Sequence, residues 1–432
     1  MALHLRATYL VLVLFYTILF KFSIGVAAKD AILVGLSGLL FLVYNRQCLE
    51  FLNRHAGIYL LFAVLAAIAI PITLLHGSSV DIVGRELLGS VVQPCLVIMC
   101  TYVLSVTAGL RFTVGVFLGA TALSGVFVVL QYLDFDAAWS ARRVLGTLQP
   151  QPGHITDLVA GQNRPVGLSF TAIMYSYQLI SAYVIGNVLY RHGLMPKKTY
   201  VMFVGAVVVI SIANGTRSLL IGIALQELLQ NPPRMRVSSI LGLAVLGVVG
   251  FAAYSYLDAT GSRVTSVADA SAVGRTMLYQ FGFRLAGDFP FGIGWGFDPA
   301  EMAWVYWDFL SELTRADAAF RLELHNAFLN FYMNYGLFGV VAILVAYYLN
   351  PGFFNKVLLY FSSYLAHAFF HNDGFFLTDD FNWFAFAILL FVCDRYGALA
   401  GGRRQTQADV SLPIAVPKAV PGRERVPSSV RP

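Results

Sequence analysis

The sequence predicts an all-α fold, a polytopic membrane bundle of about twelve transmembrane helices with a large loop region on one side. Three observations predict it. Of the 432 residues, 58% are hydrophobic and only 12% are charged, whereas a soluble domain carries about 25% charged residues. Mean hydropathy is +0.70. Apolar runs also recur along the chain at lengths close to the roughly 20 residues that a helix needs to cross a bilayer.

Twelve apolar segments are candidate spans, and the short ones are expected to be tilted, broken or re-entrant. The first candidate also resembles a signal peptide, and we expect it to be retained as a span. The candidates are 8–26, 30–44, 57–75, 88–107, 110–133, 168–189, 199–213, 217–230, 237–256, 326–349, 353–370 and 382–398.

The distribution of charge predicts the orientation of the bundle. If the spans alternate from a cytoplasmic N-terminus, Lys and Arg concentrate in the inner loops and Asp and Glu in the outer ones, as the positive-inside rule requires. Both termini are then cytoplasmic. Residues 401–432 are rich in proline and charge, so we expect a disordered tail after a single bundle spanning 1–400. The net charge of +6 is explained by this asymmetry and gives no reason to expect nucleic-acid binding.

Two connections on the outer side, residues 134–167 and 257–325, are long. Long connections in a compact fold tend to be functional. Three arginines are expected on this outer side: Arg164 and Arg275 lie in these connections, and Arg217 lies at the tight link between two short spans. A planar guanidinium grips phosphate oxygens with two hydrogen bonds, so these arginines are candidate anion-binding residues. The alternatives are snorkelling to lipid headgroups and pairing with loop carboxylates.

A second candidate group starts the span at 326–349. His325 precedes it, and Asn326, Asn330 and Asn334 follow at intervals of four, which places the amides on one helix face. Amides avoid lipid, so this face is expected to contact other helices or to line a cavity. A histidine with an ordinary pKa of about 6.5 suits a general base; the alternative is a local hydrogen bond at the helix end.

Two further polar segments are ambiguous. The run 289–297 alternates glycines with bulky residues, which we interpret as a tight aromatic turn at the membrane interface, although glycine also permits close approach to a ligand. The segment 367–380 holds histidines and carboxylates, which are metal ligands, but at no characteristic spacing. We expect a solvated acidic loop there and no metal site.

Several stretches resemble the O-antigen ligase and polysaccharide polymerase superfamily, most nearly the Wzy-type exopolysaccharide polymerases of the xanthan kind. The resemblance covers about Arg164 to Gly339. It rests on RPVGLSF, TRSLLIGIALQELL, a GR pair followed by DFPFGIGWGF, and LHNAFLNFYMNYGLFG.

The resemblance implies a membrane glycosyltransferase of the bacterial inner membrane. Its donor and acceptor would be undecaprenyl-diphosphate-linked oligosaccharides, polymerised at the periplasmic face without a cofactor. Membrane lipids, a chain-length regulator and export proteins are the other implied partners. His325 matches the proposed catalytic base of the ligases, and Arg164, Arg217 and Arg275 match their diphosphate-binding arginines.

The residues Ser218, Asn326, Asn330 and Trp295 are expected to support sugar binding, Trp295 by stacking. Two alternatives stay open. A ligase would transfer finished glycan to another acceptor, and a flippase would carry the lipid-linked sugar across the membrane. A flippase needs charges along a path through the bilayer, whereas the polar groups here crowd one face.

Overall fold

The fold was analysed in a computed structural model that describes residues 8, 26–147, 158–159, 162–169, 171–231, 270–314, 316–320, 324–371, 374–376 and 380–397. The candidate span at 237–256, nearly all of the span at 8–26, and the expected tail at 401–432 lie outside these residues. The described part is helical apart from one pair of two-residue antiparallel strands, which confirms the all-α prediction.

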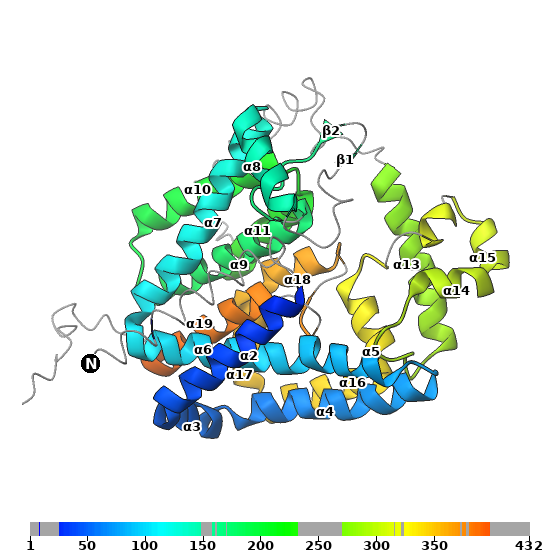
Figure 1. Ribbon diagram of the computed structural model, residues 1–432, viewed down its shortest axis with the longest axis horizontal. Coiled ribbons are helices and arrows are strands. Elements are labelled where there is room, and N and C mark those ends of the chain that lie inside the picture. The colour runs from blue at the N-terminus through cyan, green and yellow to red at the C-terminus, as the bar shows by residue number, and fades with distance from the viewer. Residues whose placement is uncertain are drawn as a thin grey trace, which may run out of the picture.

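The first half of the chain forms long apolar helices, two of them joined through π-helical turns (Figure 1). They are α2 (Val26–Val43), α3 (Asn45–Arg54), α4 (Ala56–Leu75), α5 (Val80–Leu87), η2 (Leu88–Val92), α6 (Gln93–Leu104), η3 (Ser105–Gly109) and α7 (Leu110–Tyr132).

The second half alternates membrane helices with the helices of the two long loops. Its elements are α8 (Asp136–Thr147), β1 (Leu158–Val159), β2 (Gln162–Asn163), α9 (Ala172–Arg191), α10 (Lys197–Asn214), α11 (Arg217–Gln230), α13 (Ala270–Asp288), α14 (Pro299–Val305), α15 (Trp307–Ser311), η5 (Ala316–Phe320), α16 (Ala327–Leu349), α17 (Pro351–Tyr360), α18 (Ser362–Ala368) and α19 (Asp380–Tyr396).

Five helices of the described chain are long and apolar enough to cross a membrane, or six if the bent pair α2 and α3 counts as one span. One of the five is the continuous run Val80–Tyr132, which the sequence analysis divided into two spans. The other expected spans within the described residues coincide with helices, but α11, α17, α18 and α19 are shorter than 18 residues. The protein is therefore a multi-pass membrane protein, with five or six helices of spanning length among the described residues.

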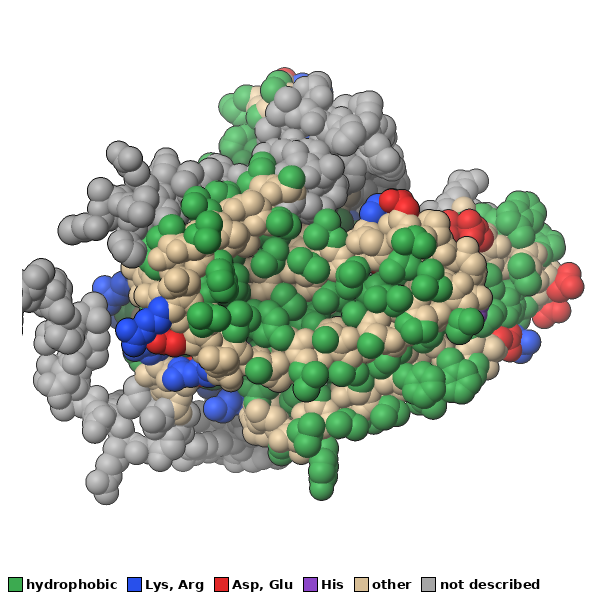
Figure 2. All heavy atoms as spheres, turned by 60° about the horizontal axis from the view of Figure 1, so that its bottom comes forward, with side chains coloured by type: hydrophobic (Ala, Val, Ile, Leu, Met, Phe, Trp, Pro, Cys, Tyr) green, Lys and Arg blue, Asp and Glu red, His purple; other side chains and the backbone are tan. Residues whose placement is uncertain are grey.

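Helices α9 and α19 occupy the centre of the bundle. In α9, 89% of the span is buried against other helices, and α19 packs against both α6 and α9. The outer surface is apolar: Figure 2 shows a broad hydrophobic band with charged side chains gathered at its two ends. A band of this kind is what a surface in contact with lipid requires.

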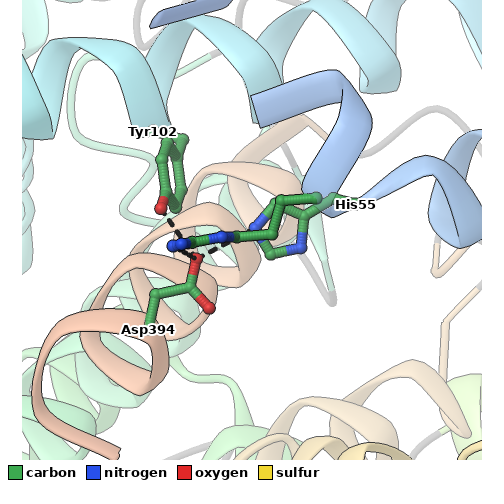
Figure 3. A network of polar contacts seen from close by, with 4 residues as sticks. His55, Tyr102 and Asp394 are labelled. Carbon is green, nitrogen blue, oxygen red and sulfur yellow. Dashed lines mark hydrogen bonds and ion pairs between the residues drawn. The ribbon is translucent and has the colours of Figure 1, made fainter. Parts of the chain in front are cut away.

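One end of α19 is tied to the first half of the chain by a polar network (Figure 3). The carboxylate of Asp394 accepts hydrogen bonds from Tyr102 at 2.7 Å and from Arg54 at 3.2 Å, and it lies 3.1 Å from Nε2 of His55. The network joins α3, α6 and α19 at the end of the bundle opposite the residues discussed below. We assign it a structural role.

The glycine-rich run 289–297 forms tight turns, as the sequence predicts, and docks into a break in α16. At Gly336 the helix takes φ +58°. The amides of Ile293 and Gly294 donate to the carbonyl oxygen of Met333 at 2.7 and 3.0 Å. A Cβ on Gly336 would lie 2.0 Å from the carbonyl carbon of Phe291. The glycines thus allow two backbones, rather than a backbone and a ligand, to approach closely.

Replacing Gly336 by Ala is expected to destabilise the protein by at least about 2 kcal/mol, since it combines a left-handed conformation with a steric clash. The measurement is the midpoint of thermal unfolding in detergent. Gly352→Ala is the matched control, because a Cβ on Gly352 meets no atom within 4 Å. Equal midpoints for the two variants would show that the close approach does not hold α16 in place.

Candidate functional site

The turn between α10 and α11 is held by an arginine from the loop before α9. Gly215 takes φ +72° and ends α10. Arg164 donates from Nε to the carbonyl oxygen of Asn214 at 3.1 Å and from Nη2 to the hydroxyl of Thr216 at 2.6 Å. Asn214 in turn donates to the carbonyl oxygen of Pro165 at 2.8 Å. These bonds fix the direction in which the next residue, Arg217, starts α11.

Ser218 links α11 to the end of α18. Its hydroxyl lies 3.0 Å from Nδ1 of His367 and 2.9 Å from Nε2 of His371. The other nitrogen of His367, Nε2, lies 3.0 Å from the hydroxyl of Ser176 in α9. Each of these four side chains is at most 5% exposed. A buried polar chain therefore joins α9, α18 and α11.

Helix α13 brings Arg275 to the same place. The hydroxyl of Tyr279, one turn along α13 from Arg275, donates to the carbonyl oxygen of Phe369 at 2.9 Å, so α13 is fastened to the end of α18. In Figure 1, α11 and α18 lie side by side in the bundle and α13 stands to their right. Arg275 acts electrostatically on His325, His367 and His371.

His325 directly precedes the N-cap of α16 in a strained backbone conformation. Its φ is +50°, which few non-glycine residues adopt and which costs about 1–3 kcal/mol. Its Nδ1 atom is buried and has no hydrogen-bond partner among the described residues. Such strain and such unpaired groups concentrate at functional sites.

Burial, and after it the charge of Arg275, lowers the pKa of His325 to about 4. This corrects the expectation of an ordinary histidine pKa. His325 is a neutral imidazole at pH 7, and Nδ1 can accept a proton whenever a nearby negative charge compensates the positive charges around it.

His371, just beyond the end of α18, is neutral for the same reasons. Burial lowers its pKa well below the ordinary value; the charges of Arg275 and Arg164 lower it further, as would protonation of His367 or His325. We call these five residues the basic cluster: Arg164, Arg275, His325, His367 and His371. The two arginines among them give this end of the bundle a concentration of positive potential, to which an anion would be attracted.

The structure brings together only part of the predicted site. Arg164, Arg275 and His325 belong to the basic cluster, and Arg217 and Ser218 start α11 beside it. The Oδ1 atom of Asn326 instead caps α16, accepting from the amides of Phe328 and Leu329.

Trp295 lies differently from the prediction, which expected its ring to stack on a sugar. Trp295 is 1% exposed and donates from its indole to the hydroxyl of Tyr335 at 3.3 Å, so its ring faces are packed in protein and it anchors the glycine-rich run. Asn330 and Asn334 are partly buried in the first turns of α16, on the segment that ends at the break at Gly336.

The sequence analysis missed His367, His371 and Ser176. It placed both histidines in a solvated acidic loop, which was wrong: His367 and His371 are at most 2% exposed, and so is Asp380, which accepts from Gln93 at 2.5 Å. The available signal was the spacing of four between the histidines at the end of an apolar run. Among the described residues, no group of three or more His, Cys, Asp or Glu could hold a metal ion.

The lowered pKa of His325 predicts the pH dependence of any reaction that uses it as a base. A base acts in its unprotonated form, and the protonated fraction rises as the pH falls through the pKa. We expect kcat/KM, which reports the free enzyme, to stay constant through neutral pH and to fall only as the pH approaches about 4. A decline centred near 6.5, the ordinary histidine value, would contradict the buried placement of His325.

Residues 199–344 match the family model for O-antigen ligase, Wzy_C. This segment is similar to an O-antigen ligase domain. The match includes Arg217, Ser218, Arg275 and His325 and confirms the superfamily resemblance of the sequence. No curated protein matches the chain.

Proposed function

We propose that the protein polymerises lipid-diphosphate-linked oligosaccharide repeat units into exopolysaccharide at the periplasmic face of the bacterial inner membrane. The observation that carries the proposal is the convergence of Arg164 and Arg275 with the imidazole of His325 at one end of the bundle. In this proposal the chain has about twelve spans with both termini in the cytoplasm, and the long loops 134–167 and 257–325 are periplasmic.

The reaction transfers a glycan from one lipid diphosphate to a sugar hydroxyl of a second lipid-linked unit. The hydroxyl oxygen forms a bond to the anomeric carbon while the bond from that carbon to the phosphate oxygen breaks. The proton passes to Nδ1 of His325, and the leaving electron pair stays on the lipid diphosphate. A single displacement of this kind inverts the anomeric configuration, and the diphosphate linkage supplies the driving force without a nucleotide.

The arginines stabilise the charge that develops on the leaving diphosphate. Arg217 and Arg275 are the principal candidates, because two donors of Arg164 already bind the turn between α10 and α11. Fixed cations aimed at developing negative charge are among the largest contributions to catalysis. The same diphosphate would raise the lowered pKa of His325, so that the substrate itself makes the imidazole a stronger base.

A ligase that transfers finished glycan to another acceptor is the second candidate, favoured by the description of the matched family. The two are separated by product analysis in membranes supplied with lipid-linked repeat units. A polymerase lengthens the glycan on its lipid carrier, whereas a ligase moves glycan of unchanged length to a new carrier. Accumulation of neither product, with the substrate merely moved across the bilayer, would indicate a flippase.

A further inference from the structure

The polar chain of Ser176, His367, Ser218 and His371 has a direction that can be read from its hydrogen bonds. Ser176 donates its single O–H to the carbonyl oxygen of Ile173 at 2.5 Å. Its oxygen can therefore only accept from Nε2 of His367. His367 is 0% exposed, and an uncompensated buried cation is strongly disfavoured, so His367 is neutral with its proton on Nε2.

The same argument runs on to His371. Because Nδ1 of His367 carries no proton, it accepts from the hydroxyl of Ser218. The oxygen of Ser218 is then left to accept, and it receives the proton of Nε2 of His371. A neutral imidazole holds one proton, so the lone pair of His371 is fixed on Nδ1. No hydrogen bond joins that atom to a described residue.

We propose that this chain holds His371 as a hydrogen-bond acceptor for a hydroxyl group of the substrate glycan, in the basic cluster whose arginines bind the diphosphate. The proposal rests on the proposed function and assigns different residues of its site to the diphosphate and to the glycan. Phosphate oxygens are acceptors and repel the lone pair on Nδ1, whereas a sugar hydroxyl can donate to it. Ser176, His367 and Ser218 are positioning residues that select the tautomer of His371.

The alternative assignment for His371 is a second diphosphate ligand. That role requires a proton on Nδ1, and hence an imidazolium beside Arg275 and Arg164 in a buried position. Burial and those two charges both oppose the second proton, so hydroxyl binding is the assignment that the surroundings favour.

The experiment measures two affinities of the full-length protein in nanodiscs. One probe is undecaprenyl diphosphate, and the other is the lipid-linked oligosaccharide fraction extracted from cells that lack this protein. The dissociation constant for undecaprenyl diphosphate, divided by that for the lipid-linked oligosaccharide, measures the contribution of the glycan to binding. In His371→Gln the amide reaches Ser218 but leaves the Nδ1 position empty. We expect this variant to lower the ratio by roughly 3- to 10-fold. Its affinity for undecaprenyl diphosphate should be unchanged.

His371→Asn is the matched variant, because its amide oxygen can occupy the Nδ1 position; we expect it to keep more of the preference than His371→Gln. An unchanged ratio in His371→Gln overturns the proposal, and so does an equal loss of both affinities in a folded protein. If the His371 variants fail to fold, Ser218→Ala tests the proposal instead. We expect Ser218→Ala to lower the ratio and Ser218→Thr, which keeps the hydroxyl, to restore it. Binding of neither probe by the wild type overturns the proposed function instead.

Discussion

Replacement of His325 by Asn is expected to lower kcat for glycan transfer by roughly 10²- to 10⁴-fold, the usual contribution of a positioned general base. Asn is the sharpest substitution, because it tolerates the left-handed backbone that His325 adopts at φ +50° and carries no group that takes up a proton near neutral pH. The variant therefore removes the base and preserves the start of α16. The measurement is the consumption of lipid-linked repeat units in membranes that contain equal amounts of each protein.

The matched control is His192→Asn. His192 follows α9 at the end opposite Ser176, and its ring bonds the carbonyl oxygen of Val188 at 2.9 Å, so its loss should leave turnover within a factor of about two. Undiminished turnover in the His325 variant would remove this residue as the base. Its lone pair at Nδ1 would then have to be explained by a structural role that no described contact provides.

Much of the architecture could be predicted from composition and from the spacing of apolar runs, because the bilayer requires every span to be a long apolar helix. Helices α4, α9, α10 and α16 begin or end within a few residues of the expected limits. The sequence also places Arg164, Arg275 and His325 on one side of the bundle, where the structure has all three acting on His371.

The errors arise where packing between distant segments decides the outcome. The sequence predicts the turn at 289–297 but does not reveal that its glycines meet the backbone of α16 and of α4 near Thr73. The two histidines at the end of α18 resemble loop residues in the sequence, which does not reveal that they contact Ser218 of α11. The division of the run Val80–Tyr132 was predictable, because the backbone leaves the helical conformation at Gly109, φ +94° and ψ 142°, between the two expected spans. The π-helical turns between α5 and α7 leave no mark in the apolar pattern of the sequence.

The second large effect is expected at Arg275. Its replacement by Lys keeps the charge but removes the planar fork that binds two phosphate oxygens. A charge-assisted hydrogen bond contributes about 1.5–3 kcal/mol, so the affinity for undecaprenyl diphosphate should fall roughly 10- to 100-fold. The measurement is a titration of the protein in nanodiscs.

Arg284→Lys is the matched control on the same helix. Arg284 lies nine residues along α13, on the opposite face, where its half-exposed side chain pairs with Asp288 at 3.1 Å, and a surface pair of this kind contributes little. Full affinity in Arg275→Lys would show that charge alone holds the diphosphate. In that case Arg275 would act mainly on the histidines. Its charge is one of the two causes that depress the pKa of His325. Removal of Arg275 should therefore raise that pKa and move the acid limit of kcat/KM to higher pH.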